Sequence, residues 1–203
     1  MGSASPRFIR GFRVILFIGA ALPLSWLGIA WQTGMLGVVP EERLLHELGR
    51  WGLYLLLATL ALGPAFRLTG WPGFPAVRRA MGLWAFTYLL LHVLVWVVMI
   101  QGGSWSFMVA EVLALRHLQT GLIAWVMLVP LVLTSVNRAR ERLGRVRWQW
   151  LHRLAYVSAA GGILHYWMVS RVIETEVIVL GLLFTTLVLF RLVERWGFSS
   201  PEK

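Results

Sequence analysis

The histidines are the side chains best able to carry metal or redox chemistry in this 203-residue chain, because it contains no cysteine. Without cysteine there is no disulfide, no thiolate-ligated or covalently attached c-type haem, and no cysteine-bound iron–sulfur cluster. A metal or redox group must therefore be held by His or Met, or be an organic cofactor. Two of the five histidines, His92 and His165, lie deep inside long apolar stretches.

His92 and His165 are expected to lie at matching depths in a membrane. His92 is about twelve residues into its apolar stretch, and His165 about fourteen residues into another that should run in the same direction. At about 1.5 Å per residue, both imidazoles lie beyond the middle of the membrane, toward its outer side. One imidazole from each of two helices at one depth is the arrangement of bis-histidine axial ligation. The sequence therefore predicts a b-type haem between His92 and His165.

Other interpretations of these residues stay open. A histidine pair is also stabilised by neighbouring carbonyl or hydroxyl groups in a purely structural role. Met99 and Met168 are competing axial ligands by residue type, although Met commonly fills apolar gaps. His46 and His117 fall at the outer ends of apolar stretches, where a position in the membrane interface is favoured over ligation.

A second, inner site is suggested by His152, thirteen residues before His165 and about 20 Å from it along a helix. The matching position on the third apolar stretch is Arg78, followed by Arg79, with no second histidine. Arginine anchors a haem propionate, a flavin phosphate or a quinone carbonyl. The inner site is thus a weakly ligated haem, a flavin or quinone site, or only structural. The two arginines are explained equally well by the excess of positive charge on the cytoplasmic side.

The elements that position these side chains are apolar helices. Apolar residues make up 58% of the chain, charged residues 14%, and mean hydropathy is +0.71, which a soluble domain cannot accommodate. A helix needs about 20 apolar residues to cross a bilayer. The sequence therefore predicts an all-α integral membrane protein, one domain of residues 1–203 with six transmembrane helices. The predicted spans are residues 14–31, 48–66, 80–100, 118–136, 151–169 and 177–192.

The basic residues indicate the orientation of these spans. Of the nineteen, fifteen lie at one end of the predicted bundle and four at the other, so both termini are expected in the cytoplasm. The net charge of +10 is distributed between the apolar stretches and does not gather on one face, which argues against nucleic acid as a partner. The partner that this pattern indicates is the lipid bilayer.

Several stretches resemble the MsrQ family, also known as YedZ, the haem-binding membrane subunits of bacterial periplasmic protein-methionine-sulfoxide reductases. They are R-R-A-M-G-L-W-A-F-T-Y-L-L-L-H (78–92), G-R-W-G-L-Y-L-L-L-A-T-L (49–60), R-W-Q-W-L-H-R-L-A-Y-V (147–157) and I-L-H-Y-W (163–167). The similarity covers about residues 10–195, in order and with nearly matching spacing.

The resemblance implies a ferric-reductase-like transmembrane fold, shared with the membrane parts of NADPH oxidases and eukaryotic metalloreductases. It implies that the haem-linked histidines are His92, His152 and His165. It also implies electron delivery from the quinone pool or a cytosolic flavin reductase to a periplasmic molybdenum-cofactor subunit that reduces methionine sulfoxide in proteins. FMN is a further cofactor that the family implies. The chain departs from dihaem relatives because its third span lacks a second histidine, so the number of haems stays open.

We therefore expect an electron-transfer subunit of a bacterial inner-membrane oxidoreductase complex, and not the catalytic subunit itself. Haem b is the expected cofactor, and FMN and quinone are candidates at the inner site. A membrane metalloreductase-like cytochrome is the nearest alternative, and it differs in its electron acceptor. A non-redox transporter or structural membrane protein is the alternative of another class, and it predicts a colourless protein.

Overall fold

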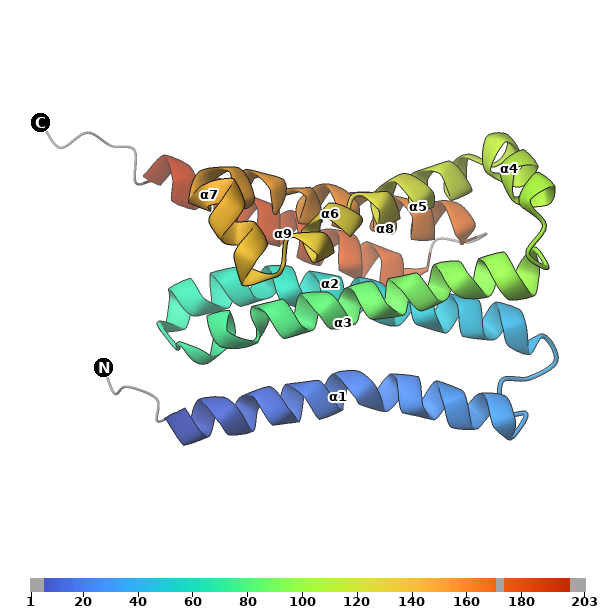
Figure 1. Ribbon diagram of the computed structural model, residues 1–203, viewed down its shortest axis with the longest axis horizontal. Helices are drawn as coiled ribbons and strands as arrows, with labels where there is room; N and C mark the ends of the chain where they lie inside the picture. The colour runs from blue at the N-terminus through green and yellow to red at the C-terminus, as the bar shows by residue number, and fades with distance from the viewer. Residues whose placement is uncertain (1–5, 171–173, 198–203) are drawn as a thin grey trace, which may run out of the picture.

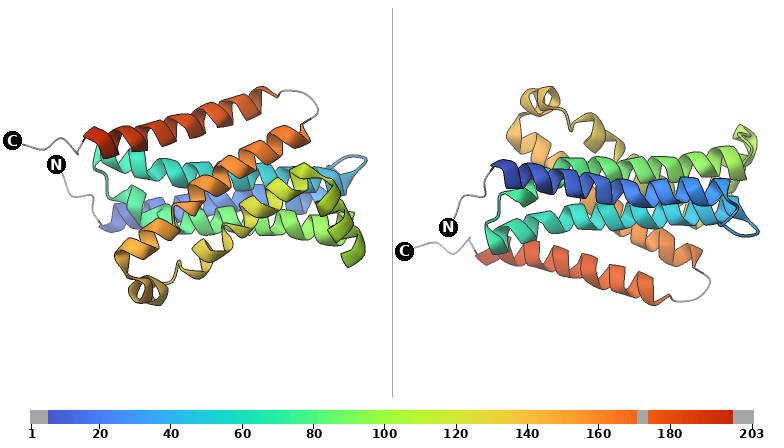
Figure 2. Two further views of the ribbon diagram at one scale, coloured as in Figure 1. Left: turned by 90° about the horizontal axis from the view of Figure 1, so that it is seen from above. Right: turned by 90° about the horizontal axis from the view of Figure 1, so that it is seen from below.

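The computed structural model describes residues 6–170 and 174–197, and within these two ranges the regular structure is helical, without a strand. Successive long helices run in opposite directions along an elongated bundle, and the start of the first helix lies at the same end as the end of the last (Figures 1 and 2). The elements are α1 (Pro6–Gln32), α2 (Pro40–Thr69), α3 (Gly73–Val95) with a π-helical turn (Trp96–Ile100), α4 (Trp105–Ala114), α5 (Arg116–Val126), α6 (Val129–Leu133), α7 (Asn137–Leu151), α8 (Leu154–Val169) and α9 (Thr175–Gly197).

Five helical segments among the described residues are long and apolar enough to cross a membrane. Together with the apolar composition, they confirm the predicted class, a multi-pass membrane protein. The remaining predicted span, 151–169, is found as α8, which is apolar but has only 16 residues. The five segments are Arg7–Gln32, Pro40–Thr69, Gly73–Ile100, Arg116–Leu133 and Thr175–Glu194.

The predicted boundaries differ from the observed helices for local reasons. The helices that contain 48–66 and 80–100 begin several residues earlier, because a helix continues through its polar first turns beyond the apolar stretch. The predicted span 118–136 is divided into α5 and α6, since Pro130 at the start of α6 removes one backbone donor and crowds the preceding turn. The basic segment before α8 is also helical, although Gly144 breaks it with φ 73° and ψ 159°.

The ends of α2 show how the sequence sets a helix boundary. Pro40 occupies the first turn, where a missing N–H costs nothing, and Glu41 and Glu42 follow at the positive end of the helix dipole. At the other end Gly70 adopts a left-handed conformation with φ 68°, and its N–H donates to the carbonyl of Phe66 at 2.7 Å. The chain then turns into α3, so α2 and α3 form an antiparallel hairpin.

The centre of the bundle is built on α2. Its buried leucines, Leu53, Leu56, Leu57 and Leu60, form a cluster with residues of α3, α6, α8 and α9. Gly52 allows the closest approach to α3, because a Cβ there would lie 2.6 Å from Cγ of Leu89. This close contact packs α2 tightly against α3.

Helix α1 is joined to the bundle by one buried hydroxyl. Tyr88 of α3 donates to the carbonyl of Ala20 at 2.7 Å and accepts from the N–H of Leu24 at 2.8 Å. In a regular helix Leu24 would donate to Ala20 itself, so the tyrosine hydroxyl is inserted into the hydrogen-bond ladder next to Pro23. The insertion leaves both backbone groups satisfied inside an apolar environment.

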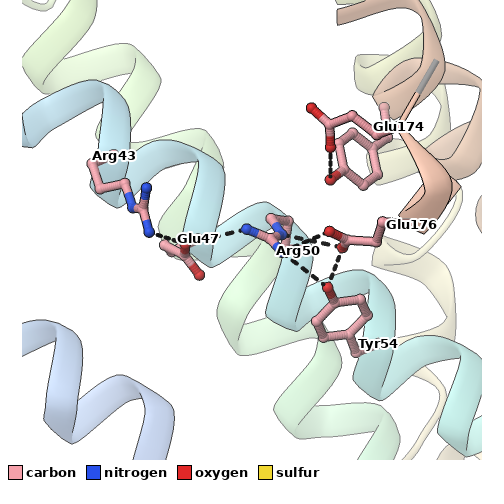
Figure 3. Close-up of polar contacts among 7 residues, drawn as sticks. Arg43, Glu47, Arg50, Tyr54, Glu174 and Glu176 are labelled. Carbon is pink, nitrogen blue, oxygen red and sulfur yellow. Dashed lines mark hydrogen bonds and ion pairs between the residues drawn. The ribbon is translucent and has the colours of Figure 1, made fainter. Parts of the chain in front are cut away.

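An ion-pair network fastens α9 to α2. The Arg50 guanidinium lies 2.6 Å from the Glu176 carboxylate and 3.3 Å from that of Glu47, and the Tyr54 hydroxyl donates to Glu176 (Figure 3). Arg43 extends the network at 3.2 Å from Glu47. The partners of Arg50 come from helices far apart in the sequence, so the network fixes a tertiary contact.

We predict that Arg50→Leu lowers the free energy of unfolding by about 1–2 kcal/mol. The Arg50 and Glu176 side chains are 35% and 25% exposed, so water weakens but does not abolish the charged hydrogen bonds. Arg43→Leu is the control, because Arg43 is 58% exposed and pairs only within its own helix; its effect should stay below about 0.5 kcal/mol. Detergent-induced unfolding measures both variants, and equal losses would contradict the tertiary role of Arg50.

Candidate functional site

The structure brings His92 of α3 and His165 of α8 together. Their ring centres lie 6.2 Å apart, and the two ring planes make an angle of 80°. The helices that carry them belong to different parts of the sequence, and each residue is half-buried. The matching depths expected from the sequence thus correspond to side chains that face one another across the bundle.

Each imidazole of the pair is fixed by one hydrogen bond to a neighbouring helix. Nδ1 of His92 lies 2.8 Å from the carbonyl oxygen of Leu45 in α2, and Nδ1 of His165 lies 2.7 Å from that of His117 in α5. A carbonyl oxygen only accepts, so Nδ1 is the protonated nitrogen in both rings. In a neutral imidazole the lone pair is then on Nε2, which is the nitrogen available to a metal.

The donor set of this pair fits a haem iron. An imidazole nitrogen lies about 2 Å from a metal that it ligates, so imidazoles on opposite sides of one iron have ring centres roughly 6 Å apart. The observed separation of 6.2 Å agrees with that spacing. In the described part of the chain no three His, Cys, Asp or Glu side chains form a group that could hold a metal ion. Two imidazoles complete an iron site where a porphyrin supplies the remaining ligands.

An unsatisfied indole, that of Trp125, lies on α5, about two helical turns after His117. Trp125 stacks on Phe86 of α3 with ring centres 6.0 Å apart and planes 20° apart. Its Nε1 is the one buried side-chain nitrogen or oxygen without a hydrogen-bond partner in the described residues. Buried polar groups are rarely left in this state, so the indole N–H fits a bound group that carries an acceptor oxygen.

His152 lies at the junction of α7 and α8, away from the histidine pair. Its Nε2 is 3.2 Å from the hydroxyl of Thr134, and its ring stacks on Trp148 with centres 4.0 Å apart. Trp148 in turn donates from Nε1 to the carbonyl of Thr134 at 3.0 Å. The sequence predicts His152 and His165 on one helix. In the structure α7 ends at Leu151 and α8 begins at Leu154, so His152 lies between the two helices.

Arg78 of α3 is near enough to His152 to interact with it electrostatically, as the sequence predicted for the inner site. Arg78 also interacts with Tyr156 and Arg191, which the sequence analysis did not identify. Arg191 of α9 donates to the Tyr156 hydroxyl at 2.7 Å. In the sequence, Arg191 stands out only as one of the fifteen basic residues at one end of the predicted bundle. Arg78 and its neighbour Arg79 are both exposed.

The remaining candidate ligands lie around the outer pair. His117 is close to His165, with ring centres 6.1 Å apart, whereas His46 is exposed as expected for an interfacial residue. The sulfur of Met168 accepts a hydrogen bond from the Thr120 hydroxyl at 3.8 Å. Met99 is exposed in the π-helical turn after α3.

Comparison with known proteins shows the family to which the chain is similar. The family described as "Ferric reductase like transmembrane component" matches residues 48–163, a range that contains His92 and His152 and ends just before His165. The chain is also similar to proteins named protein-methionine-sulfoxide reductase heme-binding subunit MsrQ. The similarity to that of Ralstonia nicotianae is 39% identity over 80% of this chain and 75% of the relative. For Rhodospirillum rubrum it is 39% over 89% and 87%, and for Herminiimonas arsenicoxydans 38% over 98% and 92%.

Proposed function

This chain belongs to the MsrQ family, within the ferric-reductase-like transmembrane group, and from this premise we propose that it holds b-type haem between His92 and His165. We propose that the protein carries electrons across a bacterial inner membrane to a periplasmic, molybdenum-dependent methionine-sulfoxide reductase subunit. The donor is the quinone pool or a cytosolic flavin reductase. The names of the relatives, heme-binding subunits of a protein-methionine-sulfoxide reductase, support both the cofactor and the acceptor.

The observation that carries the proposal is the pairing of two imidazoles with protonated Nδ1 atoms. The carbonyls of Leu45 and His117 accept hydrogen bonds from these two Nδ1–H groups, so Nε2 of each histidine is left as a ligand. His92 and His165 would both hold the haem iron through Nε2, so that neither imidazole would be replaced by dioxygen or another substrate. A bound haem would supply one-electron oxidation and reduction of its iron. Such a site favours electron transfer over chemistry at the metal.

The inner site is proposed to hold an anionic or carbonyl group of a cofactor. Arg78 and Arg191 approach one another with no acidic partner among the described side chains, and Tyr156 adds a hydroxyl. Guanidinium groups bind a haem propionate, the phosphate of FMN or a quinone carbonyl. His152 is proposed as the haem-linked or quinone-linked imidazole of this site, and Arg79 as a further anchor.

We propose six transmembrane helices with both termini in the cytoplasm, in a single domain. α8 runs beside the five longer apolar segments in the same bundle, and α1 begins at the end where α9 finishes (Figure 1). An even number of crossings follows if each of these segments spans the bilayer. The excess of basic residues at that end supports a cytoplasmic location.

We predict that His92→Ala and His165→Ala each abolish the b-type absorption of the outer site, because one imidazole cannot hold both axial positions. The purified membrane protein is examined by visible spectroscopy and by haem content per polypeptide. His46→Ala is the control, since His46 is exposed and acts on the two imidazoles only through its charge, so its loss should leave the haem absorption in place. An unchanged haem spectrum in both substituted proteins would refute the proposed ligands.

We predict that His152→Ala leaves the absorption of the outer site in place but slows its reduction by an inner-side donor at least tenfold. The reason is that His152 lies by Arg78 and not by the His92–His165 pair. Stopped-flow reduction with a quinol measures the rate, and dithionite reduction shows that the outer site itself is intact. A rate equal to that of the unsubstituted protein would exclude His152 from the electron path.

The absence of cysteine makes the topology directly testable. Arg43→Cys in α2 and Arg140→Cys in α7 lie at opposite ends of the bundle (Figure 1). In intact cells with a permeable outer membrane, a membrane-impermeant maleimide should label Cys at position 43 and not at position 140. Labelling of position 140 before cell lysis would show that the proposed orientation is inverted.

A further inference from the structure

The two imidazoles of the pair are held by the same local structure, repeated in two pairs of packed helices, α2 with α3 and α5 with α8. In α2 the acceptor carbonyl is that of Leu45, and a glycine, Gly49, follows four residues later. In α5 the acceptor is His117, and Gly121 follows at the same interval. The histidines come 43 and 44 residues after their glycines, on α3 and α8.

The four-residue interval has a definite meaning in an α-helix. The carbonyl of residue i accepts from the N–H of residue i+4, so Gly49 is the helical partner of Leu45 and Gly121 that of His117. A carbonyl oxygen has two lone pairs, and the second one is free for the imidazole. A ring that reaches this lone pair must pass directly over residue i+4.

Glycine leaves room for such an approach, whereas a Cβ at either position would crowd the ring. A Cβ at Gly49 would lie 3.0 Å from Nδ1 and 3.1 Å from Cε1 of His92. A Cβ at Gly121 would lie 2.8 Å from Nδ1 and 3.0 Å from Cε1 of His165. Neither glycine has a positive φ, so the reason for glycine here is the contact with the ring and not the backbone conformation.

We infer that Gly49 and Gly121, together with the carbonyls of Leu45 and His117, are positioning residues that set the ring plane and the protonated nitrogen of the two axial imidazoles. This inference rests on the proposed function. A hydrogen bond from Nδ1 makes an imidazole a stronger donor to iron, which favours the ferric state. The angle between the two ring planes, 80° here, governs the electron paramagnetic resonance spectrum of a low-spin ferric haem.

The test compares three kinds of Gly→Ala substitution. Gly49→Ala and Gly121→Ala place a methyl group against an axial imidazole. Gly52→Ala lies in the same helix as Gly49 and is crowded, but by Leu89, at 2.6 Å, and not by a histidine. Gly63→Ala, also in α2, meets nothing within 4 Å. Each purified protein is examined for haem content, for the low-spin ferric resonance and for the midpoint potential.

We expect Gly49→Ala to retain haem with a shifted principal g value and a raised midpoint potential, because the ring must turn away from the Leu45 carbonyl. Gly121→Ala, with the shorter contact, should shift both quantities further or lose the outer haem. Gly63→Ala should match the unsubstituted protein, and Gly52→Ala should reduce stability without a spectral shift. If the Gly121→Ala protein does not accumulate in the membrane, the Gly49→Ala protein alone tests the inference.

The inference is overturned if Gly49→Ala keeps the g values and potential of the unsubstituted protein. It is also overturned if Gly52→Ala produces the same shift, because the effect would then come from helix contact in general. Failure of the proposed function has a different signature. In that case the unsubstituted protein is colourless, or its haem spectrum survives both His92→Ala and His165→Ala.

Discussion

Inside a bilayer each imidazole N–H must find its acceptor within the protein, and this constraint organises the half of the molecule that holds His92 and His165. His92 and His165 meet it with main-chain carbonyls that already belong to helices. Side-chain acceptors at these positions would add a titratable or mobile group beside the imidazoles. A carbonyl in a helix has a fixed position, so the orientation of each ring follows from how tightly its two helices approach.

The two ends of the bundle differ in whether their arginines have acidic partners. At the end that holds the histidine pair, Arg50 is balanced by Glu47 and Glu176, and the network draws α2 and α9 together. At the opposite end, Arg78 and Arg191 are close to each other without an acidic partner among the described residues. The first arrangement stabilises the fold, whereas the second keeps positive charge available to a ligand.

The sequence predicted the parts of the site that depend on depth. A helix of constant rise brings His92 and His165 to one level whatever the details of their neighbours, and Arg78 falls near His152 for the same reason. Contacts between distant segments could not be predicted in this way. Gly49 and Gly121 resemble any other glycine in an apolar run until the ring packed on each is known. The place of His152 was also mistaken in part, because α7 ends just before it and breaks the assumed continuous helix.

The depth of the His92–His165 pair has an electrical consequence. In the proposed orientation an electron that reaches this pair from the cytoplasmic face has already crossed more than half of the apolar layer. A bacterial inner membrane is negative inside, so the membrane field acts on that electron outward, by about 2.3 kcal/mol per 100 mV for a complete crossing. Transfer to the outside is therefore electrogenic and dissipates membrane potential. Repair of oxidised proteins outside the membrane would thus draw on the energised state of the cell as well as on its reductants.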